Sequence, residues 1–212
     1  MSAAVRTAVD LARRALALEL TMWRALARWV LRRRTVPEGA EAFPYASAST
    51  PVIWVFVVVS AIEVVVVHVV VPWGTLRFAL DLAGVYGVLW MLGLLAAMRT
   101  TPHWVDGTGL RVRHGFASVD LHVPWEDIVA VRVLRRSVEG SRTVHLHVEG
   151  PRRAVSVNEA SSTQVDLELR SPRVLPHRRA GAEPVAELRI AADDPAALVR
   201  RLRAGMAAAS AR

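Results

Sequence analysis

The chain has 212 residues, a hydrophobic fraction of 53% and a formal net charge of +8. It has no cysteine, which excludes a disulfide framework and a thiolate metal site. All 27 basic residues are arginine, and Asn and Gln occur once each, a composition typical of a bacterium with GC-rich codons. The length allows one domain of ordinary size besides two membrane spans.

Residues 1–34 are predicted to form a basic amphipathic helix, because they contain neither Gly nor Pro and segregate arginine from apolar residues. Two interpretations stay open. Either the helix lies on anionic lipid, or its apolar side packs on protein, and Glu19 within that side weighs slightly against lipid. The residues expected at the lipid headgroups or at a protein partner are Arg13, Arg24 and Arg28. Arginines spread through the segment argue against a signal peptide.

Residues 35–50 contain Pro37, Gly39 and Pro44 and show neither helical nor strand periodicity, so they are predicted to be a linker. A transmembrane helical hairpin is predicted over 51–98. Its spans, 51–71 and 75–98, are each about as long as the ~20 residues of helix that cross a bilayer.

The hairpin contains three polar side chains that are candidates for a proton path, a substrate site or a partner contact: Glu63, His68 and Asp81. An ionisable group at membrane depth is a functional hypothesis by default. Counting back from the tight turn at ~1.5 Å per residue allows a His68–Asp81 pair and a Glu63–Tyr86 hydrogen bond. The structural alternative is that these groups only join the two helices. Small residues at four-residue intervals, Ala79, Ala83 and Gly87, are expected to form the close helix contact.

Arginines flank both spans, whereas the tip between them carries none. The positive-inside rule therefore places both termini in the cytoplasm of a bacterium, with a multi-pass chain in its inner (plasma) membrane. The same distribution assigns the positive charge to a membrane protein, so a nucleic-acid partner is not expected.

Residues 99–208 are predicted to form an antiparallel β-sandwich or barrel, because short alternating segments are separated by turn residues. The expected segments centre on 110–112, 119–123, 128–133, 144–148, 155–157, 165–169 and 185–190. A final helix over 196–206 begins with Asp194 as N-cap and Pro195 at its first position. The fold class is thus a membrane α+β chain.

The motifs GLRVRHG (109–115), VPWEDI (123–128) and DPAALVRRLRAG (194–205), placed after a two-helix hairpin, resemble those of bacterial pleckstrin-homology-like (PH-like) membrane proteins of the actinobacterial type. The resemblance implies a partly open seven-stranded barrel plugged by the C-terminal helix, with Trp125 and Ile128 in its core. It also implies a membrane-tethered binding or scaffold module. Arg111, Arg113 and His114 lie in a place similar to that of the basic residues through which eukaryotic relatives hold phosphoinositides. That role is not carried over to this chain, because the phosphoinositide-binding pattern is absent.

No catalytic motif occurs in the chain, so a non-enzymatic function is expected, with neither cofactor nor metal. His145 and His147 share one side of a strand, and His114 or His122 could join them in a zinc site, although a solvated strand face explains the pattern as well. Arg178 and Arg179 in a Pro-rich loop are further candidates for contact with lipid or an acidic partner.

Three functions follow from these patterns. The first is a scaffold that binds membrane lipids and an unidentified protein partner at the cytosolic face. The second is an oligomeric transport or proton path lined by Glu63, His68 and Asp81, which requires a homo-oligomer because two helices cannot enclose a pore. The third is a lipid-sensing module that uses the amphipathic helix and basic loops.

Overall fold

The computed structural model describes residues 3–33, 35–115, 117, 119–140, 142–149, 152–175 and 183–211. The chain divides into two compact units. Unit 1 consists of residues 1–34 and 50–100, and unit 2 of residues 35–49 and 101–212. The described residues mix helix and sheet, as the α+β prediction requires.

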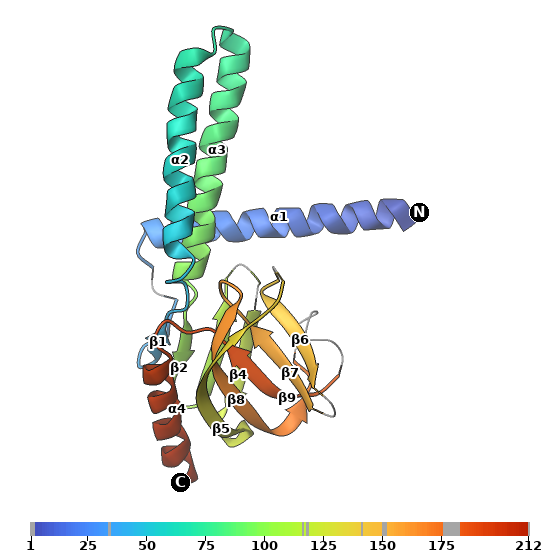
Figure 1. Ribbon diagram of the computed structural model, residues 1–212, viewed down its shortest axis with the longest axis vertical. Helices are drawn as coiled ribbons and strands as arrows, with labels where there is room; N and C mark the ends of the chain where they lie inside the picture. The colour runs from blue at the N-terminus through green and yellow to red at the C-terminus, as the bar shows by residue number, and fades with distance from the viewer. Residues whose placement is uncertain are drawn as a thin grey trace. The chain divides into compact units, whose positions relative to one another are not determined.

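Unit 1 contains three helices: α1 (Ala3–Val30), α2 (Thr50–Val70) and α3 (Gly74–Arg99). The antiparallel helices α2 and α3 are joined by the short connection 71–73, and α1 lies across α3 near the opposite end of the hairpin (Figure 1). Both α2 and α3 are long and apolar enough to cross a membrane, as the sequence predicts. Trp73 stands at the N-cap of α3 in an extended conformation.

The contact between α2 and α3 follows a spacing of alternately four and three residues. After Thr50, the less exposed positions of α2 are 53, 57, 60, 64 and 67. On α3 they are 77, 81, 84, 87 and 88, followed by all of 90–98, where α1 also contacts α3. This spacing is that of left-handed helix pairs. The prediction that Ala79, Ala83 and Gly87 form the close contact is wrong. Ala79 and Ala83 are exposed, and Gly84 is the residue that approaches α2, where an added Cβ would collide with Val64.

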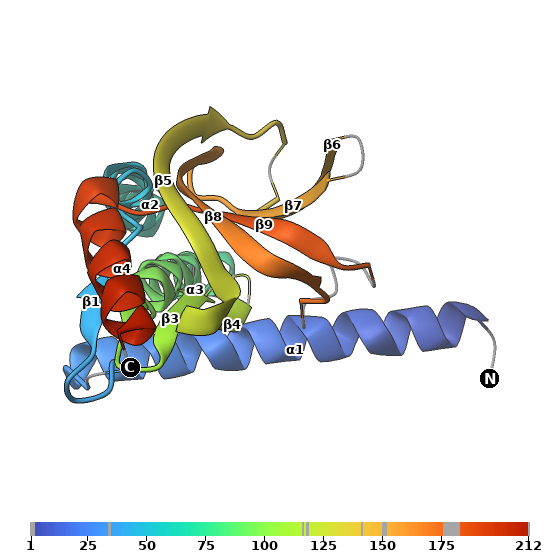
Figure 2. The same ribbon diagram turned by 90° about the horizontal axis from the view of Figure 1, so that it is seen from below.

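Unit 2 contains two sheets and a C-terminal helix (Figures 1 and 2). The first sheet has the order β1-β2-β3-β4, with β1 Glu41–Phe43, β2 His103–Val105, β3 Gly109–His114 and β4 Val119–Pro124. The second has the order β5-β8-β9-β7-β6, with β5 Ile128–Ser137, β6 Val144–Glu149, β7 Arg152–Val157, β8 Ser162–Arg173 and β9 Val185–Ile190. A 3-10 turn, η1 (Trp125–Asp127), joins the sheets, and α4 (Pro195–Ser210) ends the chain.

The alternation in the sequence explains most of these strands. In β4, for example, Val119, Leu121 and Val123 are buried, whereas Asp120 and His122 are exposed. The structure has a strand at each of the seven predicted segments. It differs from an antiparallel barrel in two respects: β7 and β9 pair in parallel, and the described strands form two sheets that do not close into a barrel.

Residues 35–50 are predicted to be a linker, but residues 35–49 belong to unit 2 and Thr50 begins α2. Glu41–Phe43 form β1 and pair with β2, and Phe43, Tyr45 and Ala46 are buried. The difference arises because such a short edge strand has no periodicity of its own. It is specified by its partner, which lies about 60 residues later in the chain.

The helix α4 closes unit 2 against both η1 and β5. Asp194 caps it by accepting a hydrogen bond from the Ala197 N–H (2.8 Å), and Pro195 begins it, as predicted. Leu198, Val199 and Leu202 bury its apolar side, which then continues through Gly205. The core of the unit also contains Trp125 and Ile128, the two core positions that the PH-like resemblance implies.

Candidate functional site

The polar residues of the hairpin do not form one group. His68 Nδ1 and Asp81 Oδ2 are 2.8 Å apart, so the predicted pair between α2 and α3 forms. Glu63 is exposed and has no hydrogen bond or ion pair with any described residue, so the predicted bond to Tyr86 does not form. At about 100° per residue, Glu63 and His68 fall on opposite sides of the stripe of α2 that contacts α3.

Tyr86 instead faces the amphipathic helix. Its ring lies 6.3 Å from that of Trp23, centroid to centroid. Glu19 lies one helical turn before Trp23 on α1. Its carboxylate accepts hydrogen bonds from the indole N–H groups of Trp23 (3.2 Å) and Trp90 (3.0 Å). Glu19 therefore joins α1 to α3. This explains why an acidic residue stands on the apolar side of the helix.

The arginines predicted to contact lipid or a partner have different surroundings. On α1, Arg13 and Arg24 are exposed, and Arg28 Nε donates to the Arg24 carbonyl at 3.3 Å. On β3, Arg111 forms an ion pair with Asp120 and lies 5.8 Å from the centre of the Trp104 ring.

Arg113, the other β3 arginine, donates to the Thr35 carbonyl at 3.2 Å. The β3 pair is therefore committed to contacts within unit 2. Arg178 and Arg179 lie outside the described residues.

The histidines considered for zinc do not converge. The rings of His145 and His147 are 6.2 Å apart, and His147 Nε2 is 2.9 Å from Ser156 Oγ. Across the ranges that the structure describes, no group of three or more His, Cys, Asp or Glu side chains is close enough to hold a metal ion. His114 contacts a different set of residues, described next.

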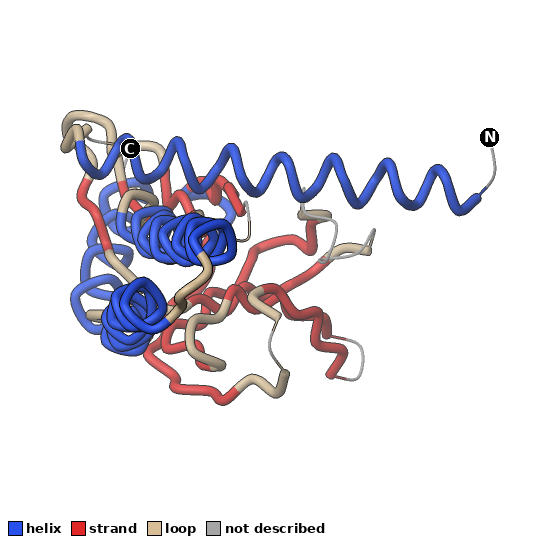
Figure 3. Tube along the Cα trace, turned by 90° about the horizontal axis from the view of Figure 1, so that it is seen from above, coloured by secondary structure: helices blue, strands red, loops and turns tan. Residues whose placement is uncertain are grey.

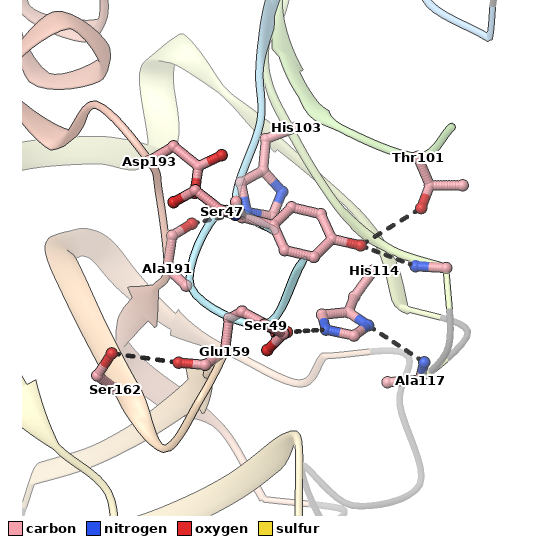
Figure 4. Close-up of polar contacts among 12 residues, drawn as sticks. Ser47, Ser49, Thr101, His103, His114, Ala117, Glu159, Ser162, Ala191 and Asp193 are labelled. Carbon is pink, nitrogen blue, oxygen red and sulfur yellow. Dashed lines mark hydrogen bonds and ion pairs between the residues drawn. The ribbon is translucent and has the colours of Figure 1, made fainter. Parts of the chain in front are cut away.

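Unit 2 also contains a cluster of polar side chains, five of which, Tyr45, Thr101, His103, His114 and Glu159, are buried (Figure 4). The Tyr45 ring is stacked between His103 and His114, with centroid distances of 4.9 and 4.8 Å and interplanar angles of 26° and 28°. The Tyr45 hydroxyl accepts from the Gly115 N–H at 3.2 Å and lies 3.4 Å from Thr101 Oγ1. Burial raises the pKa of Tyr45 to about 12.

Hydrogen bonds define the tautomer of each histidine. His103 Nδ1 accepts from the Arg113 N–H (3.0 Å), so the proton is on Nε2, which donates to the Ala191 carbonyl (3.0 Å). Burial lowers the pKa of His103 to about 3, so its ring is neutral near pH 7. By the same reasoning His114 Nδ1 accepts from the Ala117 N–H (3.3 Å), and Nε2 donates to Glu159 Oε2 (3.2 Å).

The cluster fastens residues 44–49 to the rest of unit 2. Ser49 Oγ donates to Glu159, and Ser47 donates to Asp193 Oδ1 from both its N–H (2.9 Å) and its hydroxyl (2.6 Å). The Asp193 N–H in turn donates to the Pro44 carbonyl at 2.9 Å. A pocket of about 240 Å³, lined in part by Tyr45 and Glu159, opens beside these contacts.

The turn that carries Glu159 is strained. Ala160 and Ser161 both have positive φ, 46° and 55°, in the tight turn closed by reciprocal backbone bonds between Glu159 and Ser162. A non-glycine residue in this conformation costs about 1 kcal/mol. Contacts of Glu159 with Ser49 and His114 hold the turn in place.

The cluster is arranged to hold structure and not to activate a nucleophile. Ser49 donates to a carboxylate and not to a histidine, and both nitrogens of His103 and of His114 are already hydrogen-bonded. Sequence analysis missed Tyr45, His103 and Glu159. The one available signal was Phe43 and Tyr45, two aromatic residues in a segment otherwise rich in small ones.

No family model, no curated protein and no solved structure matches this chain. The proposed function therefore rests on the chain's own residues and their contacts.

Proposed function

We propose that the chain is a membrane-anchored, non-enzymatic binding or scaffold protein. In this proposal α2 and α3 span the inner membrane of a bacterium. Unit 2 is a PH-like module on the cytosolic face, where it binds a protein partner.

The main support for a membrane anchor is the exposed apolar surface of the hairpin. Only 6% of the most apolar stretch of α2 and 11% of that of α3 is buried inside the protein, whereas a core helix of a soluble protein is mostly buried. Large apolar side chains such as Val55, Phe56, Val65 and Phe78 are 60–70% exposed. An exposed apolar surface of this extent is favourable in lipid and unfavourable in water.

Charge supports the proposed orientation. The connection 71–73 contains no charged residue and includes Trp73, whose ring suits the membrane interface. Eight arginines lie in residues 1–34, and Arg99 ends α3. By the positive-inside rule, the end of the hairpin near Arg99 faces the cytoplasm, and both termini lie there too.

Three observations support the PH-like assignment of unit 2. The GLRVRHG motif forms β3, VPWEDI spans the junction between the two sheets, and the terminal helix α4 packs on that junction. The extra strands β1 and β2 and the parallel β7–β9 pair depart from the seven-stranded pattern.

A photo-crosslinking residue at a defined position tests the scaffold proposal. Val133 lies on β5, at one edge of its sheet, with 52% of its surface exposed. We expect a crosslinker at Val133 to capture one consistent protein in intact cells, and purification of that protein to recover this chain in return. His122, an exposed residue of the other sheet, is the matched control position. We expect the control position to capture no consistent protein, and recovery of no consistent protein from Val133, in several mild detergents, would contradict the proposal.

The transport alternative gains no support from the hairpin. The His68–Asp81 pair lies on one side of the α2–α3 contact and Glu63 on the other, so the three groups do not line one path within a single hairpin.

A further inference from the structure

The helix α1 has a fixed rotational setting against α3. Going along α3 toward its C-terminal end, Tyr86 meets Trp23, then Trp90 meets Glu19, and then Gly93 meets Met22. A Cβ at Gly93 would lie only 3.2 Å from the Met22 Cβ, so the two helices approach closely at this point. Around α1, therefore, the side that carries Trp23 faces the tip of the hairpin.

The rotational setting of α1 determines which way its apolar residues face. Residues that share the angular sector of Trp23 at about 100° per residue continue as an exposed apolar row along the helix. The row consists of Val5, Val9, Leu16, Leu20 and Trp23, each between 39% and 60% exposed. Its members face the tip or point outward, although water would disfavour them.

The arginines occupy the remaining sector. Arg13, Arg24 and Arg28 lie on the sides of α1 that face away from α3 or toward its C-terminal end. The apolar and basic residues of α1 are thus separated along the direction that runs from the tip of the hairpin to the C-terminal end of α3.

The position of α1 along the hairpin matches a membrane surface. From Gly74 to Gly93, where α1 crosses, α3 rises about 28 Å at ~1.5 Å per residue, close to the ~30 Å of a hydrocarbon core. If α2 and α3 span the bilayer, α1 lies at its boundary. Figure 3 shows that α1 extends well past the hairpin, and the side chains of the apolar row are 39–60% exposed.

The geometry points to α1 as an anionic-lipid binding element: its apolar row enters the acyl boundary, and Arg13, Arg24 and Arg28 bind acidic phospholipid headgroups of the same leaflet. This inference rests on the proposed function, because it requires the hairpin to span the membrane. We assign a lipid surface as the binding partner of α1 because the apolar row is adjacent to the spanning helices. The positive charge of the arginines also complements anionic headgroups.

Nanodiscs containing the full chain test this inference. Because the chain lacks cysteine, Leu16→Cys and Val65→Cys each provide one site for a fluorophore. Quenching is measured with spin-labelled phosphatidylglycerol, with spin-labelled phosphatidylcholine at the same mole fraction, and with aqueous iodide. We expect spin-labelled lipid to quench the fluorophore at both positions. Phosphatidylglycerol should quench residue 16 at least about twofold more than phosphatidylcholine, because each arginine near an anionic surface strengthens binding to that surface about fivefold.

A triple variant, Arg13→Gln, Arg24→Gln and Arg28→Gln, should reduce that ratio to about one. Its control carries Arg135→Gln, Arg142→Gln and Arg200→Gln, exposed arginines of unit 2 with the same total charge change, and should keep the ratio.

The outcomes separate the two proposals. Iodide quenching without lipid quenching at residue 16, with residue 65 still quenched by lipid, would overturn the inference about α1 alone. Equal quenching by the two lipids would overturn its anionic preference. Absence of lipid quenching at residue 65 would overturn the spanning hairpin and, with it, both proposals.

Discussion

Replacement of Gly205 by leucine should destabilise unit 2 by about 3 kcal/mol. A Cβ at this position would lie 2.5 Å from Cζ2 and 2.8 Å from Cζ3 of Trp125. The Trp125 ring cannot move aside easily, because it is buried and its N–H donates to the Gly107 carbonyl at 3.0 Å. Relief of the collision therefore requires α4 to separate from η1, which exposes Leu198 and Leu202.

Urea unfolding of the full chain in detergent, followed by the β-sheet signal in circular dichroism, measures this loss. Ala204→Leu is the matched control, because Ala204 precedes Gly205 on the exposed side of α4. Its effect should stay within about 0.5 kcal/mol. If Gly205→Leu and Ala204→Leu unfold at the same urea concentration, the packing of α4 on Trp125 is not as described.

Acidification should weaken unit 2 through His103. The folded-state pKa, lowered to about 3 by burial and by the neighbouring His114 and Arg113, is below the unfolded value of 6.5. The unfolded chain therefore binds a proton first as the pH falls. The stability that His103 contributes is present above pH 6.5 and is lost progressively down to about pH 3. Between pH 7 and pH 5 the loss is about 2 kcal/mol.

Substitution of this histidine removes the effect. In His103→Gln the decrease in unfolding free energy between pH 7 and pH 5 should be smaller by about 2 kcal/mol, whereas His122→Gln, at an exposed position, should keep the decrease of the unmodified chain. The ring proton resonances of His103 in the full chain supply an independent measurement, and they should not titrate between pH 7 and pH 5. Titration of His103 near pH 6.5 would contradict its description as a neutral, buried ring.

Local patterns explain which parts of the fold could be predicted. The hairpin, the seven strands and α4 are specified by run length, alternation and capping, all of which are properties of neighbouring residues. The His68–Asp81 pair was also accessible, because a tight turn fixes the register of two antiparallel helices. The contact through Gly84 was not, because four-residue spacing of small residues does not tell which face of α3 meets α2.

The buried cluster could not be predicted because its members come together from distant parts of the chain. Tyr45 and Thr101 are 56 residues apart, and Ser49 and Glu159 are 110 apart. Similarly, the ion pair that occupies Arg111 depends on the β3–β4 register, which sets Arg113 opposite Asp120 and brings Asp120 near Arg111. A sequence pattern identifies such an arginine but not the carboxylate beside it.

Single-cysteine labelling in intact bacterial cells tests the central claim most directly, because the chain has no cysteine of its own. The two positions are Trp73→Cys at the tip of the hairpin and Ser137→Cys on the exposed end of β5. We expect a membrane-impermeant maleimide to label position 73 from outside and position 137 only after permeabilisation. We also expect the chain to stay in the membrane after an alkaline wash. Labelling of position 137 in intact cells, or release of the chain by the wash, would contradict the central claim.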